Sequence, residues 1–194
     1  MDLSIVATLY HSAPYLNEFY TRIKKEAEKI TQDYEIILVN DDSPDNSLEV
    51  ALALQKEDER IIVIDMAKNY VHQKTMLTGV SFAKGKLVFL IDCDLEEEPE
   101  LLGTFYSEML KAKVDIIYGQ QQTRKGGIIE RLTGDIFYKI INFLSEVPIP
   151  TNLVTARLMT QRYVRSLVSH KEREMYLGGI FVIAGFKQMP ITVK

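Results

Sequence analysis

Short runs of apolar residues alternate with longer amphipathic stretches along the first half of the chain. The runs are rich in Ile and Val, which is typical of buried parallel strands. They lie at Leu3–Leu9, Tyr34–Val39, Arg60–Ile64, Leu87–Ile91 and Val114–Tyr118. Between them, apolar residues recur at helical spacing in Leu16–Ile30, Ser47–Gln55, Gln73–Ala83 and Pro99–Lys111. This order predicts an α/β fold with a mostly parallel central sheet and helices on both faces.

After Tyr118 the alternation of strand and helix patterns changes. Thr123–Gly127 is polar and contains two glycines, which predicts a loop. Ile128–Leu144 repeats apolar residues at helical spacing and is followed by Pro148 and Pro150, so we expect a long helix that ends before them. A further helix and a last strand are predicted at Arg162–Val168 and Phe186–Val193.

Tyr176–Phe186 is apolar apart from its glycines, but its 11 residues are too few to span a bilayer. We expect this segment to pack on the core or to lie near a membrane surface. The chain contains no internal repeat and no linker. We therefore predict a single domain over residues 1–194, with a nucleotide-binding half at about residues 1–119 and an acceptor-side half at about residues 120–194.

The composition limits the classes of protein that remain. With 46% hydrophobic and 26% charged residues, the 194-residue chain is globular, which excludes a disordered or low-complexity protein. Its one cysteine, Cys93, excludes a disulfide framework and a cysteine-based zinc site. No apolar stretch reaches the roughly 18 residues of a membrane helix, and the N-terminus does not read as a signal peptide, so a reduced, cytosolic setting is expected.

The two halves of the chain differ in charge. Acidic residues outnumber basic ones in residues 1–114, and basic residues outnumber acidic ones in residues 115–194. A nucleic-acid-binding protein would carry its sites on a basic surface, whereas the motifs described next lie in the acidic half. The pattern favours a divalent metal on the acidic half, an anionic ligand on the basic half, and no nucleic acid.

Polar residues follow each predicted strand of the first half. They are Thr8–His11, Asn40–Ser43, Asp65 with Lys68 and Asn69, and Asp92–Asp94. In open parallel sheets ligands bind beyond the carboxyl ends of the strands, which meet at one edge. Packing alone does not require polar residues there, so the pattern predicts a ligand-binding crevice.

The most informative motif is the acidic run Asp92–Glu100, which holds six carboxylates in nine residues directly after a buried strand. Asp92 and Asp94 point the same way in an extended backbone, and Glu96 continues that face. Such carboxylates repel one another unless a cation lies between them, and Mg²⁺ is commonly held by one or two carboxylates together with substrate phosphates. The alternative is stabilisation of a helix N-terminus, to which we assign Glu97, Glu98 and Glu100.

The acidic pair Asp41 and Asp42 follows the second predicted strand. A carboxylate there can accept hydrogen bonds from a nucleobase or a ribose, or it can serve as a helix cap or a turn residue, and taken alone these readings are even. Ser43–Asp45 already suits the turn, which leaves Asp41 more available for a ligand.

Basic and histidine residues complete the candidate chemistry. Arg124, Lys125, Arg131 and Arg157 could bind phosphate through bidentate guanidinium contacts or as point charges, although any one of them alone would read as a surface residue. The three histidines have no metal-ligand spacing, and we assign no role to His72 at the start of a predicted helix. We expect Cys93 to point into the sheet and to be unreactive.

Taken together, these residues resemble family 2 glycosyltransferases of the GT-A (Rossmann-like) fold, and within that family the branch of dolichyl- and polyprenyl-phosphate sugar synthases. The resemblance covers essentially the whole chain. It rests on Ser4–Tyr10, Ile37–Ser47, Lys68–Asn69, Phe89–Leu95, Pro99–Glu100, Tyr118–Gly119, Arg124, Phe137–Tyr138, Asn142, Ile149–Pro150 and Arg157–Leu158.

The resemblance implies inverting transfer of a sugar from a UDP- or GDP-sugar to a lipid-phosphate or polysaccharide acceptor, as in the synthesis of lipopolysaccharide and other cell-envelope glycans. Asp41 would bind the base and Asp92 the ribose side, with further nucleotide contacts from Thr8, Tyr10 and Lys68. Asp94 and Glu96 would hold Mg²⁺ or Mn²⁺ on the diphosphate. Arg124, Arg131 and Arg157 would hold a phosphate of the donor or the acceptor.

The chain also departs from the family pattern. Thr8 replaces the usual Pro, Val71 stands where Gly is frequent, and Thr155-Ala156 replaces the Asp-Phe that usually precedes Arg157-Leu158. The last departure leaves a hydroxyl acceptor open, for which Glu172 or Glu174 could supply a base. Helix-surface charge is the alternative for both glutamates.

Two other functions remain open from the sequence. The acidic pair after a strand is also found in signalling receiver domains, with Asp92 as the phosphate acceptor, although here a full strand–helix unit precedes the pair. Asn40 and Thr155 are compatible with a non-catalytic relative. Since members of the family often continue into membrane helices, we expect a chain that extends beyond Lys194 and lies at the cytoplasmic face of a membrane. Tyr176–Phe186 could equally meet a membrane or a second copy in a homo-oligomer.

Overall fold

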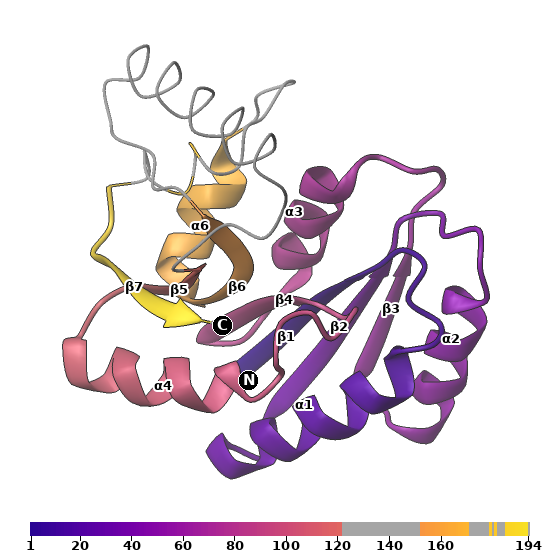
Figure 1. Cartoon of the computed structure of the whole chain (residues 1–194), viewed down its shortest axis with the longest axis horizontal. Helices are drawn as coiled ribbons and strands as arrows, with labels where there is room; N and C mark the ends of the chain where they lie inside the picture. Colours follow the sequence, from indigo (N-terminus) through magenta and orange to yellow (C-terminus); the bar gives the residue numbers. More distant parts are fainter. Residues whose placement is uncertain (122–151, 171–178, 180, 182–184, 194) are drawn as a thin grey trace.

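The computed structural model describes residues 1–121, 152–170, 179, 181 and 185–193 (Figure 1). Its strands are β1 (Leu3–Leu9), β2 (Tyr34–Asn40), β3 (Ile61–Asp65), β4 (Leu87–Asp92), β5 (Ile116–Gln121), β6 (Leu153–Thr160) and β7 (Gln188–Val193). Its helices are α1 (Leu16–Ile30), α2 (Ser47–Glu57), α3 (His72–Phe82), α4 (Leu101–Ala112) and α6 (Gln161–Ser169). The predicted loop at Thr123–Gly127, the predicted helix at Ile128–Leu144, and Glu172 and Glu174 lie outside the described residues.

The described strands form one sheet in the order β3-β2-β1-β4-β6-β5-β7. β1 is parallel to both β2 and β4, and β2 is parallel to β3. β6 is antiparallel to its neighbours β4 and β5, while β7 is parallel to β5. The predicted α/β architecture with a mostly parallel sheet is therefore confirmed.

Helices cover both faces of the sheet because its central strands are apolar on both sides. Every residue of β1 is buried, and Ile5 packs toward α1, α2 and α4 on one face. Val6 packs toward α3 and α6 on the other face (Figure 1). At Gly79, α3 lies so close to the sheet that an added Cβ would be 2.5 Å from Val6 Cγ1 and 2.7 Å from Val39 Cγ2.

The predicted elements that lie within the described residues agree with the structure to within three residues at each end, with one omission. The strand β6 was not predicted, since no element was assigned to the residues between Pro150 and Arg162. Pairing with β4 and β5 on its two sides makes this segment a strand. The helix expected from Pro99 begins two residues later, at Leu101.

A buried carboxylate links α1 to the turn between α2 and β3 through hydrogen bonds. Asp58 accepts hydrogen bonds from the Tyr20 hydroxyl at 2.8 Å, from Lys24 Nζ at 3.2 Å and from Arg60 Nε at 2.8 Å. The Arg60 hydrogen bonds, with those from Tyr20 and Lys24, hold the pKa of Asp58 well below its usual value, against the opposing effect of burial. The ionised carboxylate is thus part of the folded state.

We expect Asp58→Asn to lower the free energy of unfolding by about 2 kcal/mol at pH 7, because charge-assisted hydrogen bonds are lost. A pKa lowered on folding contributes stability above the unfolded value of about 3.9, and this contribution is lost as the pH falls through the folded pKa. The difference in the free energy of unfolding between wild type and variant should therefore become smaller below about pH 4. Urea unfolding between pH 3 and pH 8 measures this difference. A difference that stays constant across that range would contradict the role of the charge.

Candidate functional site

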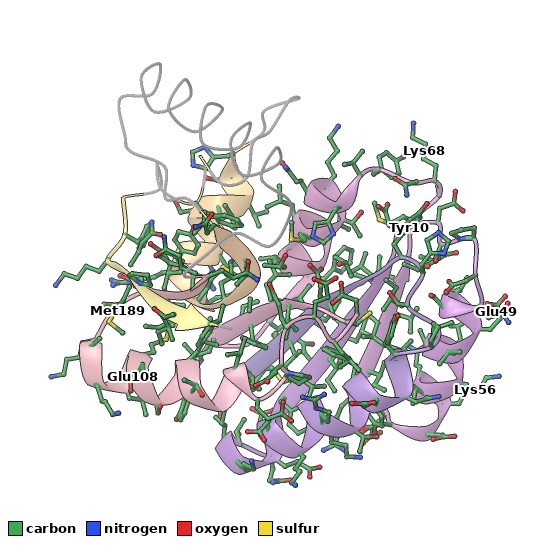
Figure 2. All side chains as sticks on the ribbon, viewed as in Figure 1. Tyr10, Glu49, Lys56, Lys68, Glu108 and Met189 are labelled. Carbon is green, nitrogen blue, oxygen red and sulfur yellow. The ribbon has the colours of Figure 1, made fainter. Side chains whose placement is uncertain are left out.

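The carboxyl ends of the central strands bring the predicted polar residues to one edge of the sheet. Thr8 lies beside Asp92 in the pairing of β1 with β4, and Leu9 lies beside Asn40 in the pairing of β1 with β2. Figure 2 shows Tyr10 and Lys68 toward the end of the molecule to which these strands run, away from Glu108 and Met189. The carboxyl ends of β1, β2 and β4 are thus neighbours in space, as predicted.

Asp92 at the end of β4 is held by two side chains from other elements. The Thr8 hydroxyl donates a 2.7 Å hydrogen bond to Asp92 Oδ1, and His72 Nε2 lies 3.4 Å from Asp92 Oδ2. From the sequence we assigned no role to His72, whereas the structure places its ring beside Asp92. The position of His72 shortly after the carboxyl end of β3 was the signal that pointed to this edge.

The loop before α3 reaches Asp92 through a strained residue. Val71 has φ 73° and ψ 138°, a conformation that a β-branched residue rarely adopts. The Asn69 side-chain oxygen accepts the Val71 N–H at 3.0 Å, and Asp41 Oδ1 accepts the Tyr70 N–H at 2.8 Å. These bonds fix the loop so that His72 begins α3 next to Asp92. Val71 is also the position where the family pattern favours Gly.

Replacing Val71 with Gly should therefore raise the stability of the protein. A residue strained in this way costs about 1–3 kcal/mol of folding free energy, which the substitution removes. Glycine also gives the unfolded chain more conformational freedom, and this lowers the gain in stability by about 1 kcal/mol. We expect a net gain of about 1 kcal/mol, or an increase in Tm of about 2–4 °C. Val71→Ala keeps the Cβ and is the matched control in thermal unfolding. A glycine variant no more stable than the alanine variant would contradict the strain.

The acidic residues after β2 divide into turn residues and one candidate ligand. Asp45 accepts hydrogen bonds from Ser43, Ser47 and the Ala13 N–H, and these bonds outweigh burial and lower its pKa to about 2. The assignment of Ser43–Asp45 to the turn is confirmed. Asp41 is buried, with its Oδ1 bonded to the Tyr70 N–H, and its contact with a nucleobase stays a prediction.

Aromatic side chains flank this end of the sheet. Tyr10 follows β1 and is 52% exposed, and its ring meets that of His11 edge-on. Lys68 Nζ lies 5.0 Å from the centroid of the Tyr70 ring. An exposed aromatic ring near a buried carboxylate can stack on a planar base, and a lysine beside it can contact a phosphate.

The acidic loop after β4 turns sharply instead of remaining extended. Leu95 has φ 62°, and Asp94 Oδ1 accepts the N–H of Glu96 at 2.9 Å. Our prediction of an extended backbone from Asp92 to Glu96 is therefore wrong. Desolvation in the loop, with the negative charges of Asp92 and Glu96, raises the pKa of Asp94. A cation beside Asp94 would relieve this repulsion.

Asp94 and Glu96 suit a metal that takes most of its ligands from a substrate. Within the described part of the chain, no three His, Cys, Asp or Glu side chains are grouped to hold a metal ion by themselves. Mg²⁺ and similar ions need only one or two protein carboxylates when phosphate oxygens and water complete the shell. The donor set here fits that arrangement.

Glu97 does not stabilise the start of α4, contrary to our prediction. Its two carboxylate oxygens accept the backbone N–H groups of Thr155 at 2.7 Å and Ala156 at 2.8 Å on β6. Burial and the charge of Asp92 raise the pKa of Glu97 to about 7, although these hydrogen bonds and Arg157 act against the shift. Glu100 instead binds Arg22 of α1, with Nη2 and Oε2 2.6 Å apart.

Arg157 lies inside the sheet, between Leu90 of β4 and Tyr118 of β5. Only 5% of the residue is exposed, and burial lowers its pKa to about 10. Its guanidinium donates to the carbonyls of Thr155 and Val154, both at 2.9 Å, and stacks on the ring of Phe181 at 3.5 Å. The described contacts are structural, and its binding of phosphate stays a prediction. Arg124 and Arg131 lie outside the described residues.

Two further predictions can be compared with the structure. Phe181, from the apolar segment Tyr176–Phe186, is buried against the α3 and α6 face of the sheet, as expected of a segment that packs on the core. Cys93 is buried and its pKa is raised to about 12 by burial, as expected of an unreactive thiol. Among the helices of the described residues, none is long and apolar enough to cross a membrane.

Comparison with known proteins identifies relatives of the whole chain. A "Putative glycosyltransferases" protein of Mycobacterium tuberculosis (strain CDC 1551 / Oshkosh) is 46% identical over 194 residues, all of this chain and 57% of the relative. The "Uncharacterized glycosyltransferase YkcC" of Bacillus subtilis is 29% identical over 98% of this chain and 59% of its own length. The "Prophage bactoprenol glucosyl transferase homolog" of Escherichia coli K12 is 26% identical over 96% of this chain and 61% of its own. The chain thus spans less than two thirds of the length of these relatives.

Solved structures show the same fold at low sequence identity. The mannosyltransferase PcManGT of Pyrobaculum calidifontis, in complex with GDP-Man and Mn²⁺, matches 98% of this chain and 54% of its own with a TM-score of 0.68 at 12% identity. Staphylococcus aureus TarS 1-349 matches all of this chain and 59% of its own with a TM-score of 0.62 at 15% identity. Both likenesses support the GT-A fold.

The model of the family "Glycosyl transferase family 2" matches residues 4–168, which include β1 from its second residue, β2 to β6 and the acidic loop. This match excludes the receiver-domain alternative, because it accounts for the strand–helix unit that precedes the acidic pair. From the shared fold, the relatives and the family model together, the chain belongs to glycosyl transferase family 2 and has the GT-A fold.

Proposed function

We propose that this chain is the catalytic domain of an inverting, metal-dependent enzyme that transfers a sugar from a UDP-sugar to a lipid-phosphate acceptor. The observation that carries the proposal is the meeting of Thr8, Asp41 and Asp92 at the carboxyl edge of the sheet, with the acidic loop directly after Asp92. Ligands of open α/β sheets bind at this edge.

The donor nucleotide would lie across the ends of β1, β2 and β4. Asp41 would accept a hydrogen bond from the base, and the exposed ring of Tyr10 offers a stacking surface. Asp92, oriented by Thr8 and His72, would accept from the ribose. The Lys68 ammonium, which lies beside Tyr70, would meet negative charge on the diphosphate.

Asp94 and Glu96 would hold Mg²⁺ or Mn²⁺ against the diphosphate. The bound ion supplies charge stabilisation to the leaving diphosphate. The chain's own contribution is to place carboxylates where that charge develops, on a loop whose turn is fixed by the Asp94–Glu96 hydrogen bond. PcManGT, whose structure contains Mn²⁺ with GDP-Man, supports a metal in this fold.

The contacts of Asp41 favour uracil over guanine. Asp41 Oδ1 already accepts the Tyr70 N–H, so a base meets mainly Oδ2. Uracil presents a single imide N–H between two carbonyls, whereas guanine presents two adjacent donors that suit both oxygens of a carboxylate. Structures of TarS with UDP and of PcManGT with GDP-Man show that the fold accommodates both nucleotides.

A lipid phosphate is the acceptor that relatives support. Several, including the Escherichia coli protein, are named bactoprenol glucosyl transferases or homologues of them. An anionic phosphate needs no general base. Thr155-Ala156, where the sugar synthases usually carry Asp-Phe, is the departure that keeps a hydroxyl acceptor as the alternative. A lipid-phosphate acceptor would place the enzyme at the cytoplasmic face of a membrane. A polysaccharide is the alternative acceptor.

A thermal-shift panel tests the donor proposal. The wild-type chain is heated with UDP, GDP, dTDP, CDP or AMP, each with and without Mn²⁺. We expect Mn²⁺-dependent stabilisation by UDP, about 2.7 kcal/mol at 100 times its Kd, with a smaller effect of GDP. Stabilisation by GDP alone would contradict the choice of uracil. No stabilisation by any diphosphate would contradict catalysis and favour the non-catalytic relative.

A further inference from the structure

Glu97 joins two parts of the fold at the point where their strand pairing stops. β4 pairs with β6 from Leu87 with Thr160 to Leu90 with Arg157. Beyond this pair the chain after β4 turns away into the acidic loop, and the N–H groups of Thr155 and Ala156 are bonded to the carboxylate of Glu97. A side chain from the loop thus takes the place of the missing strand partner.

The backbone of β6 is shaped to meet this carboxylate. In a regular strand, successive N–H groups point to opposite sides, so one carboxylate cannot accept from two adjacent residues. The pairing of β5 with β6 changes register between Tyr118 and Gln120, opposite this part of β6. This irregularity accompanies the arrangement that lets both N–H groups reach Glu97.

Arg157 binds the carbonyl side of the two peptide groups whose N–H groups bind Glu97. Its Nη2 donates to the Val154 carbonyl and its Nε to the Thr155 carbonyl. The N–H groups of the same peptides, those of Thr155 and Ala156, donate to Glu97. Glu97 and Arg157, with charges close enough to influence each other, therefore fix the start of β6 together. The guanidinium of Arg157 and the carboxylate of Glu97 therefore bind the same stretch of β6 backbone.

The loop has little packing of its own on the side facing β7. A cavity of about 400 Å³ lies there, lined in part by Glu96, Glu98, Leu101, Val154 and Val193. On its other side the loop packs against the hydrophobic core through Cys93 and Leu95. Toward β7, where the cavity leaves space, the two hydrogen bonds of Glu97 connect the loop to β6.

We propose that Glu97 is a positioning residue of the transferase site, whose carboxylate clamps the acidic loop onto β6 and so holds Asp92 and Asp94 in the arrangement that binds a metal–diphosphate. This inference rests on the proposed function and adds to it a residue that touches no substrate. It differs from a merely structural role because it predicts a change in ligand affinity in protein that remains folded.

Three variants separate these roles. Glu97→Gln is nearly isosteric but leaves one oxygen for two N–H donors. Asp115→Asn is the matched control for lost stability, because Asp115 is also a buried carboxylate and accepts from Thr160 and Arg162 at the opposite end of β6. Glu98→Gln removes one negative charge from the exposed part of the same loop.

Two measurements on folded protein, well below Tm, give the result. Calorimetric titration with UDP in MnCl₂ gives Kd, and hydrogen–deuterium exchange reports the amides of residues 92–98, 155 and 156. We expect Glu97→Gln to weaken UDP binding about tenfold or more, as loss of outer contacts to metal ligands does, and to speed exchange in the loop. Asp115→Asn and Glu98→Gln should stay within about twofold of the wild-type Kd.

An unchanged Kd in Glu97→Gln, with only the Tm lowered as in Asp115→Asn, would overturn the positioning role. Wild-type protein that binds no UDP would refute the proposed function instead. In that case exchange across residues 92–98 still decides whether Glu97 holds the loop, since unchanged exchange in Glu97→Gln would overturn the clamp itself.

Discussion

Asp94→Asn should remove the Mn²⁺-dependent part of UDP binding and slow sugar transfer by about a thousandfold. Loss of a metal's charge stabilisation costs several kcal/mol in the transition state, and each 1.36 kcal/mol corresponds to about a factor of ten in rate. Asparagine retains the oxygen that accepts the Glu96 N–H, so the turn of the loop should persist. The variant therefore separates the charge of Asp94 from its effect on the backbone.

The measurement compares Kd for UDP with and without Mn²⁺, and turnover of a UDP-sugar, in wild type and variant. Glu98→Gln controls for the loss of a single charge from the same loop, and it should bind as the wild type does. A variant that retains Mn²⁺-dependent binding would show that Asp94 is not the metal ligand. Equal losses in both variants would show that the overall charge of the loop, and no single carboxylate, determines affinity.

Arg157→Met should lower the free energy of unfolding by about 3–4 kcal/mol, which is about 6–16 °C in Tm. The substitution removes hydrogen bonds to the carbonyls of Val154 and Thr155, and it removes the cation from the ring of Phe181. It also leaves the half-buried Glu97 carboxylate without its cationic neighbour. Each of these losses occurs inside the protein, where water cannot compensate.

Arg157→Lys distinguishes support of the fold from contact with a phosphate. Lysine retains the charge but not the planar fork, so we expect about half of the loss of stability caused by Met. If Arg157 also binds phosphate, the folded lysine variant should bind UDP or the acceptor more weakly, with a reduced dependence on salt. A methionine variant as stable as the wild type would contradict the structural role. An unchanged affinity for UDP in the lysine variant would show that Arg157 does not bind a phosphate of the donor.

Some residues of the candidate site could be located from the sequence alone, and others could not. Thr8, Asp41 and Asp92 could be placed from the sequence, because a parallel sheet brings the carboxyl ends of its strands to one edge whatever the side chains are. His72 lay in the same sequence neighbourhood, but its contact with Asp92 depends on how closely α3 packs on β1 and β2 at Gly79. The distance between α3 and the sheet is set by the volumes of side chains in α3, β1 and β2.

Glu97 shows where reasoning from the pattern fails. A glutamate just before a helix is normally placed to interact with that helix, and local rules gave no reason to look elsewhere. Its partners are 58 and 59 residues away, on a strand that the sequence did not predict. The burial of Arg157 was missed for the same reason, since only pairing of β6 with β4 and β5 encloses it.

The sequence by itself determined the order of strands and helices up to β5, the family, and the edge of the sheet at which the candidate site lies. These depend on periodicity and on short motifs, which are properties of neighbouring residues. The tertiary structure decided that β6 enters the sheet antiparallel, that Glu97 binds its N–H groups, and that Arg157 is enclosed rather than exposed. Each of these depends on contacts between distant segments, whose free energy is set by packing and burial after the chain has folded.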